Sequence, residues 1–415
     1  MNTPSLGNLT VATLASLVFS IACGGDSGST PHGGDTSNSG GTSNGGSSNG
    51  TPNGNGGAPS TGSGDKDAGN GSGGAAQAGS GGSDANGGSS TGGANGGSSP
   101  SGGSGPSGGA SASGGAPSSG DGGLDDALSA AAKAAQNDPL CTGVQPFYWE
   151  IGDADGTLHG ESVGGARYSA TTDMEIASAS KWVFGAYVVE RFKDDLSKID
   201  DDAMTMRSGY VSLVYDSCVG STTVQACFDA GKNSTHTAAD DGLFYYNGGH
   251  FQKYAVDLGL GGDDAATLTA DMKKLLGSEL DFAFRSPQLA GGIHTSATGY
   301  AGFLRKILRG DLAIGAHLGE NAVCTLPSSC KQAAYSPASP EAWHYSYGHW
   351  VEDDPTNGDG AFSSPGAFGF YPWIDATKTH YGIVARYSLS AGAYVESAKC
   401  GNVIRRAYEA ALHGT

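Results

Sequence analysis

The sequence predicts a mixed α/β (α+β) domain: an antiparallel sheet built from both ends of the domain, flanked by helices, with a helical subdomain between. Two observations lead to this prediction. Glycine and aromatic residues are distributed unequally, because 38 of the 72 glycines lie in residues 24–123 while all 35 aromatic residues lie outside that segment. In residues 124–415, segments rich in aromatic and β-branched residues lie near both ends, and helical patterns lie between them.

The glycine-rich segment 24–123 separates the folded part of the chain from the N-terminus. A segment with no aromatic ring and few aliphatic side chains cannot bury enough apolar surface to offset its chain entropy. We expect a flexible tether with an r.m.s. span of about 50–60 Å, from Gly/Ser coil statistics. The glycines keep no strict period of three, which excludes collagen. Residues 124–415 are long enough for one large domain.

Residues 1–23 have the features of an export signal. The apolar run 6–22 is too short and too polar for a convincing spanning helix but suits a signal-peptide core. It ends in S-I-A-C-G, which resembles the lipobox of bacterial lipoproteins, where the chain is cut before the cysteine and lipidated on it. The usual leucine is replaced by Ser20 and residues 1–4 lack Lys and Arg, so an ordinary cleavable signal is the alternative. We predict an exported cell-envelope lipoprotein, periplasmic or outer-surface, that is held to the membrane only through a lipid on Cys23.

The charge balance narrows the choice of partners. The formal net charge is −19, of which −5 lies in residues 24–123 (six Asp and one Lys), so −14 belongs to residues 124–415. An acidic domain without a basic stripe argues against nucleic acid as a partner.

The cysteines of residues 124–415 form an even set, which in an exported chain suggests disulfides. Six cysteines allow fifteen pairings, but the sequence favours three pairs: Cys218 with Cys227, Cys324 with Cys330, and Cys141 with Cys400. Free buried thiols are the alternative. No pair has the C-x-x-C spacing of a zinc site and the histidines are scattered, so we expect no metal and no cofactor.

Hydrophobic patterns and turn signals assign the elements in order along the domain. The sequence predicts a helix in 124–137, two strands around an Asp-Gly turn in 146–164, an apolar helix in 174–192 that begins near Ser178, a helix in 296–308, strands in 343–351, 366–374 and 380–387, and an amphipathic helix in 400–412.

The first candidate site is the S-x-x-K tetrapeptide at 178–181. On a helix, Ser178 and Lys181 lie on one face one turn apart, as a hydroxyl nucleophile and its amine base must. Two other S-x-x-K tetrapeptides, at 63–66 and 328–331, lie in the tether and across a predicted disulfide loop. Only Ser178 opens a helix with an apolar body, although a simple N-cap beside a solvated lysine is the alternative.

Two further elements carry polar groups on glycine-rich backbone. The Y-x-N triplet of Tyr245 and Asn247 lies in a loop marked by glycines and presents a phenol and a carboxamide. The segment S-S-P-G-A-F-G at 363–369 leads into a strand, where glycine lets a substrate approach the backbone and exposes an N–H. A turn with packed aromatics and a proline-led edge strand are the respective alternatives.

The order of these elements resembles the serine β-lactamase and penicillin-binding-protein superfamily, in the branch of class C β-lactamases, DD-peptidases and related esterases. The segments A-G-G-I-H-T-S-A at 290–297 and Y-G-H-W-V at 347–351 are similar to further motifs of that branch, with His349 in place of a glycine. The resemblance covers residues 140–412. It implies that Ser178 is acylated and that Lys181 and Tyr245 share the general-base role.

The resemblance also implies the substrate contacts. Asn247 would bind the substrate amide or steady Lys181, and the N–H groups of Ser178 and Ala367 would form the oxyanion hole. The third motif of the β-lactamases, K-T-G, is replaced here by Ser364, Pro365 and Gly366.

The missing lysine of the third motif weakens the case for an anionic substrate. The K-T-H triplet at 378–380 lies after the strand in an expected hairpin turn, and Arg285 or Arg386 would have to supply a substitute cation. The sequence therefore favours a general acyl-serine hydrolase of esters or amides. The resemblance implies a small-molecule ester or amide, or a peptidoglycan-like substrate, as its partner. A true β-lactamase or DD-carboxypeptidase and a catalytically silent binding lipoprotein are the alternatives.

Overall fold

The computed structural model describes residues 122–193 and 195–414. The predicted signal peptide 1–23 with Cys23, and all but the last two residues of the predicted tether 24–123, lie outside the described residues. No helix within the described ranges is long and apolar enough to cross a membrane.

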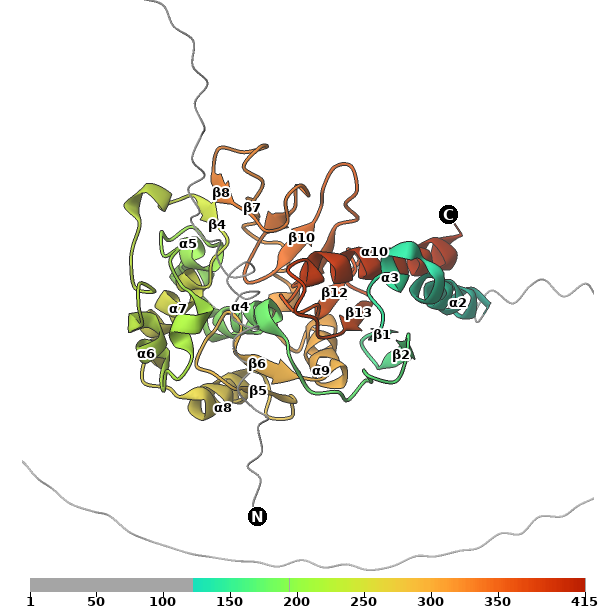
Figure 1. Cartoon of the computed structure of the whole chain (residues 1–415), viewed down its shortest axis with the longest axis horizontal. Helices are drawn as coiled ribbons and strands as arrows, with labels where there is room; N and C mark the ends of the chain where they lie inside the picture. The colour runs from blue at the N-terminus through green and yellow to red at the C-terminus, as the bar shows by residue number, and fades with distance from the viewer. Residues whose placement is uncertain (1–121, 194, 415) are drawn as a thin grey trace, which may run out of the picture. The chain divides into compact units, whose positions relative to one another are not determined.

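An eight-stranded antiparallel sheet has the strand order β2-β1-β13-β12-β11-β10-β9-β7. Its strands are β1 (Phe147–Gly152), β2 (Thr157–Val163), β7 (Val323–Cys324), β9 (His344–Tyr345), β10 (Trp350–Glu352), β11 (Ala361–Ser363), β12 (Tyr371–Ile374) and β13 (Tyr381–Ala385). The first strand of the domain pairs with the last one, with Tyr148 opposite Ala385. This confirms the predicted antiparallel sheet assembled from both ends of the domain, and Figure 1 shows the blue-green strands beside the red ones.

Helices cover both faces of this sheet. Side chains alternate between the two faces of a strand, so Gly382 and Val384 of β13 face α10 (Ala393–His413), while Tyr381 contacts α9 (Ala297–Leu308) through Arg305. The N-terminal helices α2 (Gly122–Asn137) and α3 (Pro139–Thr142) pack against α10 (Figure 1).

The remaining elements include the predicted helical subdomain and two small sheets. The helices are α4 (Ser180–Phe192), α5 (Asp201–Met204), α6 (Val224–Asp229), α7 (Gly249–Ala255), which runs into a π-helical turn (Val256–Leu260), and α8 (Ala265–Leu276). The small sheets join β3 (Met174–Glu175), β6 (Ile293–Thr295) and β5 (Phe282–Phe284) in antiparallel order, and β4 (Phe244–Tyr245) with β8 (Ala333–Tyr335) in parallel. Short 3-10 turns lie at Ala177–Ala179, Leu196–Lys198, Tyr215–Cys218, Ala238–Asp240 and Ala313–Gly315.

Four predicted elements differ from the structure. The single strand predicted over 343–351 is instead two short strands, β9 and β10, which pair antiparallel with Trp350 opposite Tyr345. The strand predicted over 366–374 is confined to β12, because Gly366 N–H donates to the carbonyl of Phe370 and Gly369 has a φ of 100°, so the chain turns there. The helix expected from near Ser178 is α4, which follows a 3-10 turn. The C-terminal helix begins seven residues before the predicted Cys400, at Ala393.

The three predicted disulfides, Cys141–Cys400, Cys218–Cys227 and Cys324–Cys330, are all present. The first links α3 to α10 over 259 residues of sequence and so ties the start of the domain to its last helix. The other two close short loops of the chain.

Candidate active site

Ser178 lies in the 3-10 turn Ala177–Ala179 between β3 and α4 and is 2% exposed. The residue before it, Ala177, has a φ of 45°, a left-handed conformation that costs a non-glycine residue roughly 1–3 kcal/mol. Tyr300 Oη donates to the carbonyl of Ala179 at 2.9 Å and fixes the other side of the turn. The fold therefore holds Ser178 in a strained, well-supported turn at the start of a buried helix.

Lys181 is the immediate partner of Ser178. Its Nζ donates to Ser178 Oγ at 2.8 Å and to the carbonyl of Ala290 at 3.0 Å, and its side chain is fully buried. Ala290 belongs to the A-G-G segment that the sequence analysis singled out. These contacts hold Nζ within hydrogen-bond distance of the Ser178 hydroxyl, where a general base has to lie.

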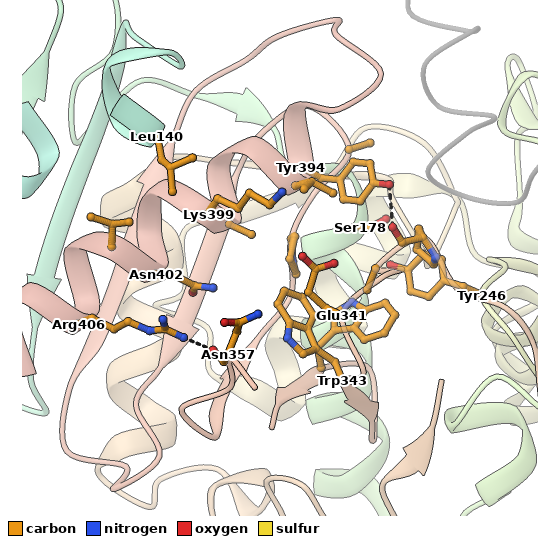
Figure 2. Close-up of a pocket in the computed structure, with 18 residues that line it drawn as sticks. Leu140, Ser178, Tyr246, Glu341, Trp343, Asn357, Tyr394, Lys399, Asn402 and Arg406 are labelled. Carbon is orange, nitrogen blue, oxygen red and sulfur yellow. Dashed lines mark hydrogen bonds between the residues drawn. The ribbon is translucent and has the colours of Figure 1, made fainter. Parts of the chain in front are cut away.

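The structure brings Tyr246, and not Tyr245, to this pair. Tyr246 lines the same cavity as Ser178 (Figure 2), and Lys181 Nζ lies 4.8 Å from the centre of its ring. The ring of Tyr245 packs against that of Tyr335 at 5.2 Å, and burial, with a smaller effect of the Asp240 charge, raises its pKa. Within the described residues Tyr245 makes no hydrogen bond to Ser178 or Lys181. Neighbouring residues at the end of a strand point to opposite faces, and this alternation is the signal that separates the two tyrosines.

Asn247 is buried, and its amide is engaged by the neighbouring backbone. Its Oδ1 accepts from the N–H groups of Leu213 and Gly249 at 3.1 and 2.8 Å, and its Nδ2 donates to the carbonyl of Leu213 at 3.3 Å. The predicted contact of Asn247 with Lys181 is not among these hydrogen bonds. In this structure Asn247 holds the segment at 213 beside the site.

The segment after β11 reaches Ser178 as the sequence predicts. Ser364 Oγ donates to the carbonyl of Ser178 at 3.1 Å. Gly366 lies so close to the carbonyl of Ile176 that a Cβ atom would overlap it, which explains the glycine. Ala367 lines the cavity together with Ser178, and its N–H donates to no group in the part of the chain that the structure describes. The two residues predicted to supply the oxyanion hole, Ser178 and Ala367, thus line one cavity.

Two close approaches explain why the Y-G-H-W segment lies against α4. A Cβ atom at Gly185 would overlap the carbonyl of Tyr347, and one at Gly348, which has a φ of 79°, would overlap the carbonyl of Lys181. His349, in the position of the expected glycine, stacks on Trp182 with ring centroids 5.5 Å apart, and its complete burial lowers its pKa to about 4. These contacts fix the helix that carries Lys181.

The cations named as substitutes for the missing lysine do not line the cavity. Arg285 is exposed and lies 3.5 Å from Asp173, and Arg386 is buried against Ser397 and Glu396. Lys378 lies in the turn after β12, where its half-buried side chain donates to the carbonyl of Gly315 at 3.2 Å.

A cavity of about 360 Å³ extends from Ser178 along α10 (Figure 2). Its wall comes from α10, from the loop before β9 and from the ends of β10 and β11, and sequence reasoning missed the α10 contribution. The lining residues are Leu140, Ser178, Tyr246, Pro337, Ala338, Glu341, Trp343, Trp350, Asn357, Pro365, Ala367, Tyr394, Val395, Ala398, Lys399, Asn402, Val403 and Arg406. Between the described residues, no three His, Cys, Asp or Glu side chains lie together as a metal site requires.

No family model and no curated protein matches the sequence. The structure is similar to solved structures of a penicillin-binding protein from Bacillus halodurans (12% identity, TM-score 0.47, covering 64% of this chain and 97% of that one). It is also similar to simvastatin synthase (LovD) from Aspergillus terreus, with 14% identity and a TM-score of 0.46, covering 68% of this chain and 98% of that one. A third similar structure is a β-lactamase from Mycobacterium bovis, with 11% identity and a TM-score of 0.40, covering 62% of this chain and 94% of that one.

Proposed function

We propose that this chain is a serine hydrolase that cleaves ester or amide bonds through an acyl-serine intermediate, with Ser178 as the nucleophile and Lys181 as its general base. The observation that carries the proposal is the buried Ser178–Lys181 pair with 2.8 Å between Oγ and Nζ. This distance lies in the range that a base needs in order to take a proton directly. A simple N-cap beside a solvated lysine would leave Lys181 exposed.

The reaction follows from these positions. Neutral Lys181 takes the hydroxyl proton as Ser178 Oγ attacks the carbonyl carbon, and the N–H groups of Ser178 and Ala367 stabilise the resulting oxyanion. Collapse of the intermediate expels the alcohol or amine, which receives the proton, and leaves an ester on Ser178. Water then attacks this ester and regenerates the free serine.

We propose Tyr246 for the tyrosine role that the Y-x-N motif gave to Tyr245. The position of Tyr246 supports the assignment, because it lines the cavity with Ser178 while Lys181 Nζ lies over its ring. From there its hydroxyl relays the proton: it donates its own proton to the leaving alcohol or amine and takes the proton that Lys181 received from Ser178. Ser364 and Pro365 in place of K-T disfavour a dedicated β-lactamase, so esters and amides are the proposed substrates.

A matched set of variants of the full-length chain tests both assignments. Ser178→Ala should lose at least about a thousandfold in kcat/KM for p-nitrophenyl esters and all labelling by a fluorophosphonate. Ser328→Ala, from the exposed S-x-x-K at 328–331, should retain both. Tyr246→Phe should lose about a hundredfold or more, whereas Tyr245→Phe should stay close to the parent.

The outcomes separate the candidate functions. Labelling of Ser178 by fluorescent penicillin with turnover of nitrocefin would favour a β-lactamase or DD-carboxypeptidase. No Ser178-dependent labelling by any probe would favour a silent binding protein. A loss in Tyr245→Phe but not in Tyr246→Phe would return the base role to the motif tyrosine.

We also propose that the enzyme acts at the cell envelope, held by a lipid on Cys23. The support is the lipobox-like sequence before Cys23 and the three disulfides formed by the even set of six cysteines. Cys23→Ala should abolish fatty-acid labelling, and globomycin should block processing. A mature N-terminus beyond Cys23 would contradict the proposal.

A further inference from the structure

The far part of the cavity carries a stripe of hydrogen-bond donors on one helix. Lys399, Asn402 and Arg406 of α10 line the cavity whose other end is Ser178. Their spacing of three and four residues places them on one helix face. The same cavity is also lined by apolar side chains, including Val395 and Ala398 of the same helix.

Lys399 supplies a positive charge that no protein group neutralises by contact. Its side chain is exposed and reaches into the cavity in Figure 2. It makes no ion pair or hydrogen bond with any of the residues that the structure describes. In a domain with a formal net charge of −14, an unpaired lysine that lines the cavity of the nucleophile is a binding group for an anion.

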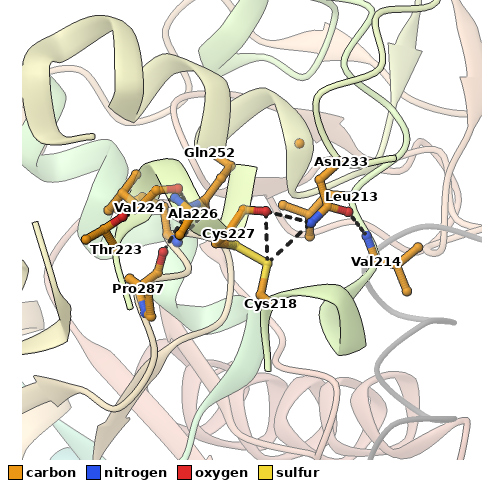
Figure 3. Close-up of a disulfide and its surroundings, with 12 residues drawn as sticks. Leu213, Val214, Cys218, Thr223, Val224, Ala226, Cys227, Asn233, Gln252 and Pro287 are labelled. Atoms are coloured by element: carbon orange, nitrogen blue, oxygen red, sulfur yellow. Dashed lines mark hydrogen bonds between the residues drawn. A yellow bond between two sulfur atoms is a disulfide. The ribbon is translucent and has the colours of Figure 1, made fainter. Parts of the chain in front are cut away.

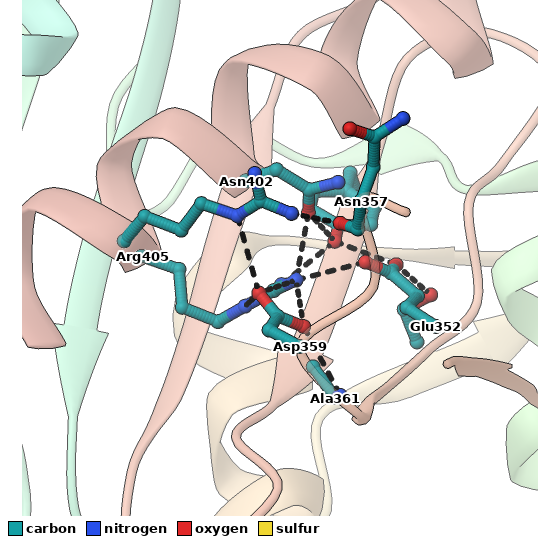
Figure 4. Close-up of polar contacts among 9 residues, drawn as sticks. Glu352, Asn357, Asp359, Ala361, Asn402 and Arg405 are labelled. Atoms are coloured by element: carbon teal, nitrogen blue, oxygen red, sulfur yellow. Dashed lines mark hydrogen bonds and ion pairs between the residues drawn. The ribbon is translucent and has the colours of Figure 1, made fainter. Parts of the chain in front are cut away.

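Asn402 supplies a donor whose orientation is fixed from behind. Its Oδ1 accepts from Tyr371 Oη and from Arg405 Nη2, both at 2.8 Å, and both of these residues are fully buried (Figure 4). A flipped amide would present its N–H groups to the Arg405 guanidinium, which can only donate. Its Nδ2 therefore stays on the cavity side, where it has no acceptor within the described ranges.

The other charges around the cavity limit where an anion can bind. Glu341 faces the cavity from the loop opposite α10 and its charge contributes to the raised pKa of Tyr394. Arg406 is already engaged, by the carbonyl of Asn357 and by Asp359, with 3.7 Å between its Nε and that carboxylate. An anionic group is thus repelled by the loop and attracted by Lys399 and Asn402.

Resting on the proposed function, we infer that the substrate carries a carboxylate on one arm, separated from the scissile carbonyl by an apolar segment. Lys399 binds the carboxylate through its charge, and Asn402 donates a hydrogen bond to it. Lys399 of α10 then supplies the cation that is missing where Ser364, Pro365 and Gly366 replace the K-T-G motif. Neither Arg285 nor Arg386 lines this cavity.

Two series of esters test the inference in the full-length chain. In one, p-nitrophenyl monoesters of succinic to suberic acid place the carboxylate on the acyl arm, and in the other, acetyl esters of ω-hydroxy acids place it on the alcohol arm. Each acid is compared with its neutral methyl ester. At one chain length in one series we expect the acid to exceed its methyl ester by about tenfold in kcat/KM, the effect of one charge-assisted hydrogen bond.

The variants assign that preference to its residues. Lys399→Met should abolish the acid preference, Lys399→Glu should reverse it in favour of amine-tailed esters, and Glu341→Gln should increase it. Lys274→Met is the matched control, because this exposed lysine is on α8, well away from α10 in Figure 1, and should keep the parent ratio. Equal rates for acids and methyl esters at every length would overturn the inference, as would an acid preference that survives in Lys399→Met.

A binding measurement separates this inference from the proposed function. Calorimetry of Ser178→Ala with the same acids needs no turnover, and binding about tenfold weaker in the Ser178→Ala/Lys399→Met double variant supports the carboxylate site even if no ester is cleaved. Ser178-dependent cleavage of neutral esters without Lys399-dependent binding leaves the hydrolase standing and removes the carboxylate site.

Discussion

The two sides of the candidate active site are held in place by different chemistry. On the α10 side, a buried ion-pair network joins the helix to β10 and β11 (Figure 4). On the side of residues 213–233, the chain is held by the disulfide Cys218–Cys227 and by side-chain amides (Figure 3). Both arrangements solve the same problem, because a nucleophile in a turn needs neighbouring loops that do not move.

The ionic side is centred on Arg405, which is fully buried. Its Nη2 lies 2.8 Å from Glu352 and 2.8 Å from Asp359. Glu352 also accepts from Ser363 Oγ, and the next residue, Ser364, holds the carbonyl of Ser178. The network is thus connected to Ser178 through the adjacent residues Ser363 and Ser364. It also fixes Asn402 in the cavity wall.

The side of residues 213–233, which carries the disulfide Cys218–Cys227, relies on neutral groups. Asn233 Nδ2 donates to the carbonyl of Cys227 at 2.8 Å, and its Oδ1 accepts from Val214 N–H at 2.9 Å. Gln252 Nε2 donates to the carbonyls of Val224 and Pro287 at 3.0 and 2.8 Å. This side depends on oxidation of the cysteines. The ionic side depends on every charge having its partner, because an isolated buried charge is far more costly than a complete pair.

Breaking the ionic side should have the largest effect on stability. Glu352→Ala leaves Arg405 without one of its two carboxylates, and we expect a loss of about 3–5 kcal/mol in the free energy of unfolding, measured by urea denaturation. Glu352→Gln, which keeps the volume and some hydrogen bonds, should lose less. Glu279→Gln removes the partner of Lys306 in an exposed pair and should cost under about 1 kcal/mol. Equal losses in Glu352→Ala and Glu279→Gln would remove the distinction between buried and exposed pairs here.

The titrating carboxyl of Glu175 links the segment 213–233 to the turn that carries Ser178. Burial raises the pKa of Glu175 to about 7. The hydrogen bond from Tyr215 Oη, 3.2 Å away, acts in the opposite direction and offsets part of this rise. Because the folded chain holds this proton more tightly than the unfolded chain, the stabilisation is complete below about pH 4.5 and is lost as the pH rises through about 7.

Glu175→Gln should therefore match the parent near pH 4 and exceed it at pH 8, by at most on the order of 3 kcal/mol in unfolding free energy. Tyr215→Phe removes a hydrogen bond to the ionised carboxylate, so it should move the loss of stability to higher pH. Unfolding curves at each pH measure both effects. A constant difference between Glu175→Gln and the parent from pH 4 to pH 8 would show that Glu175 does not titrate in this window.

The sequence predicts the main sheet and the disulfides of this molecule, because these depend on amino-acid composition and on the periodicity of apolar residues. The strands 147–152 and 381–385 are apolar and β-branched enough to be recognised, and three short-range or terminal cysteine pairs leave few alternatives. The S-x-x-K pair is also predictable, since its geometry is fixed within one turn of a single helix.

The parts that the sequence does not predict depend on contacts between distant segments. Tyr245 and Tyr246 are adjacent and chemically identical, and only the pairing of β4 with β8 decides which one reaches Lys181. In the sequence, Lys399 and Asn402 are ordinary polar residues of an amphipathic helix. Only the position of α10 beside Ser178 shows that they line the cavity. The amphipathic pattern correctly gives a helix there, but it does not identify which helix face lines the cavity.

Removing the disulfide Cys218–Cys227 should cost less stability than breaking the ionic side, and its effect on catalysis should be local. For Cys218→Ala/Cys227→Ala, which opens a separation of 9 residues, loop-closure entropy gives a loss of about 2–3 kcal/mol. Cys324→Ala/Cys330→Ala opens a separation of 6 and should lose a similar amount. The two double variants should differ in catalysis, because only the first releases the segment that Asn247 and Tyr215 hold beside Ser178. We expect kcat/KM for neutral p-nitrophenyl esters to fall in the first variant and to stay near the parent in the second, measured at a temperature where both are folded. Equal rates in both would mean that the neutral hydrogen bonds of Asn233 and Asn247 hold this side without the disulfide.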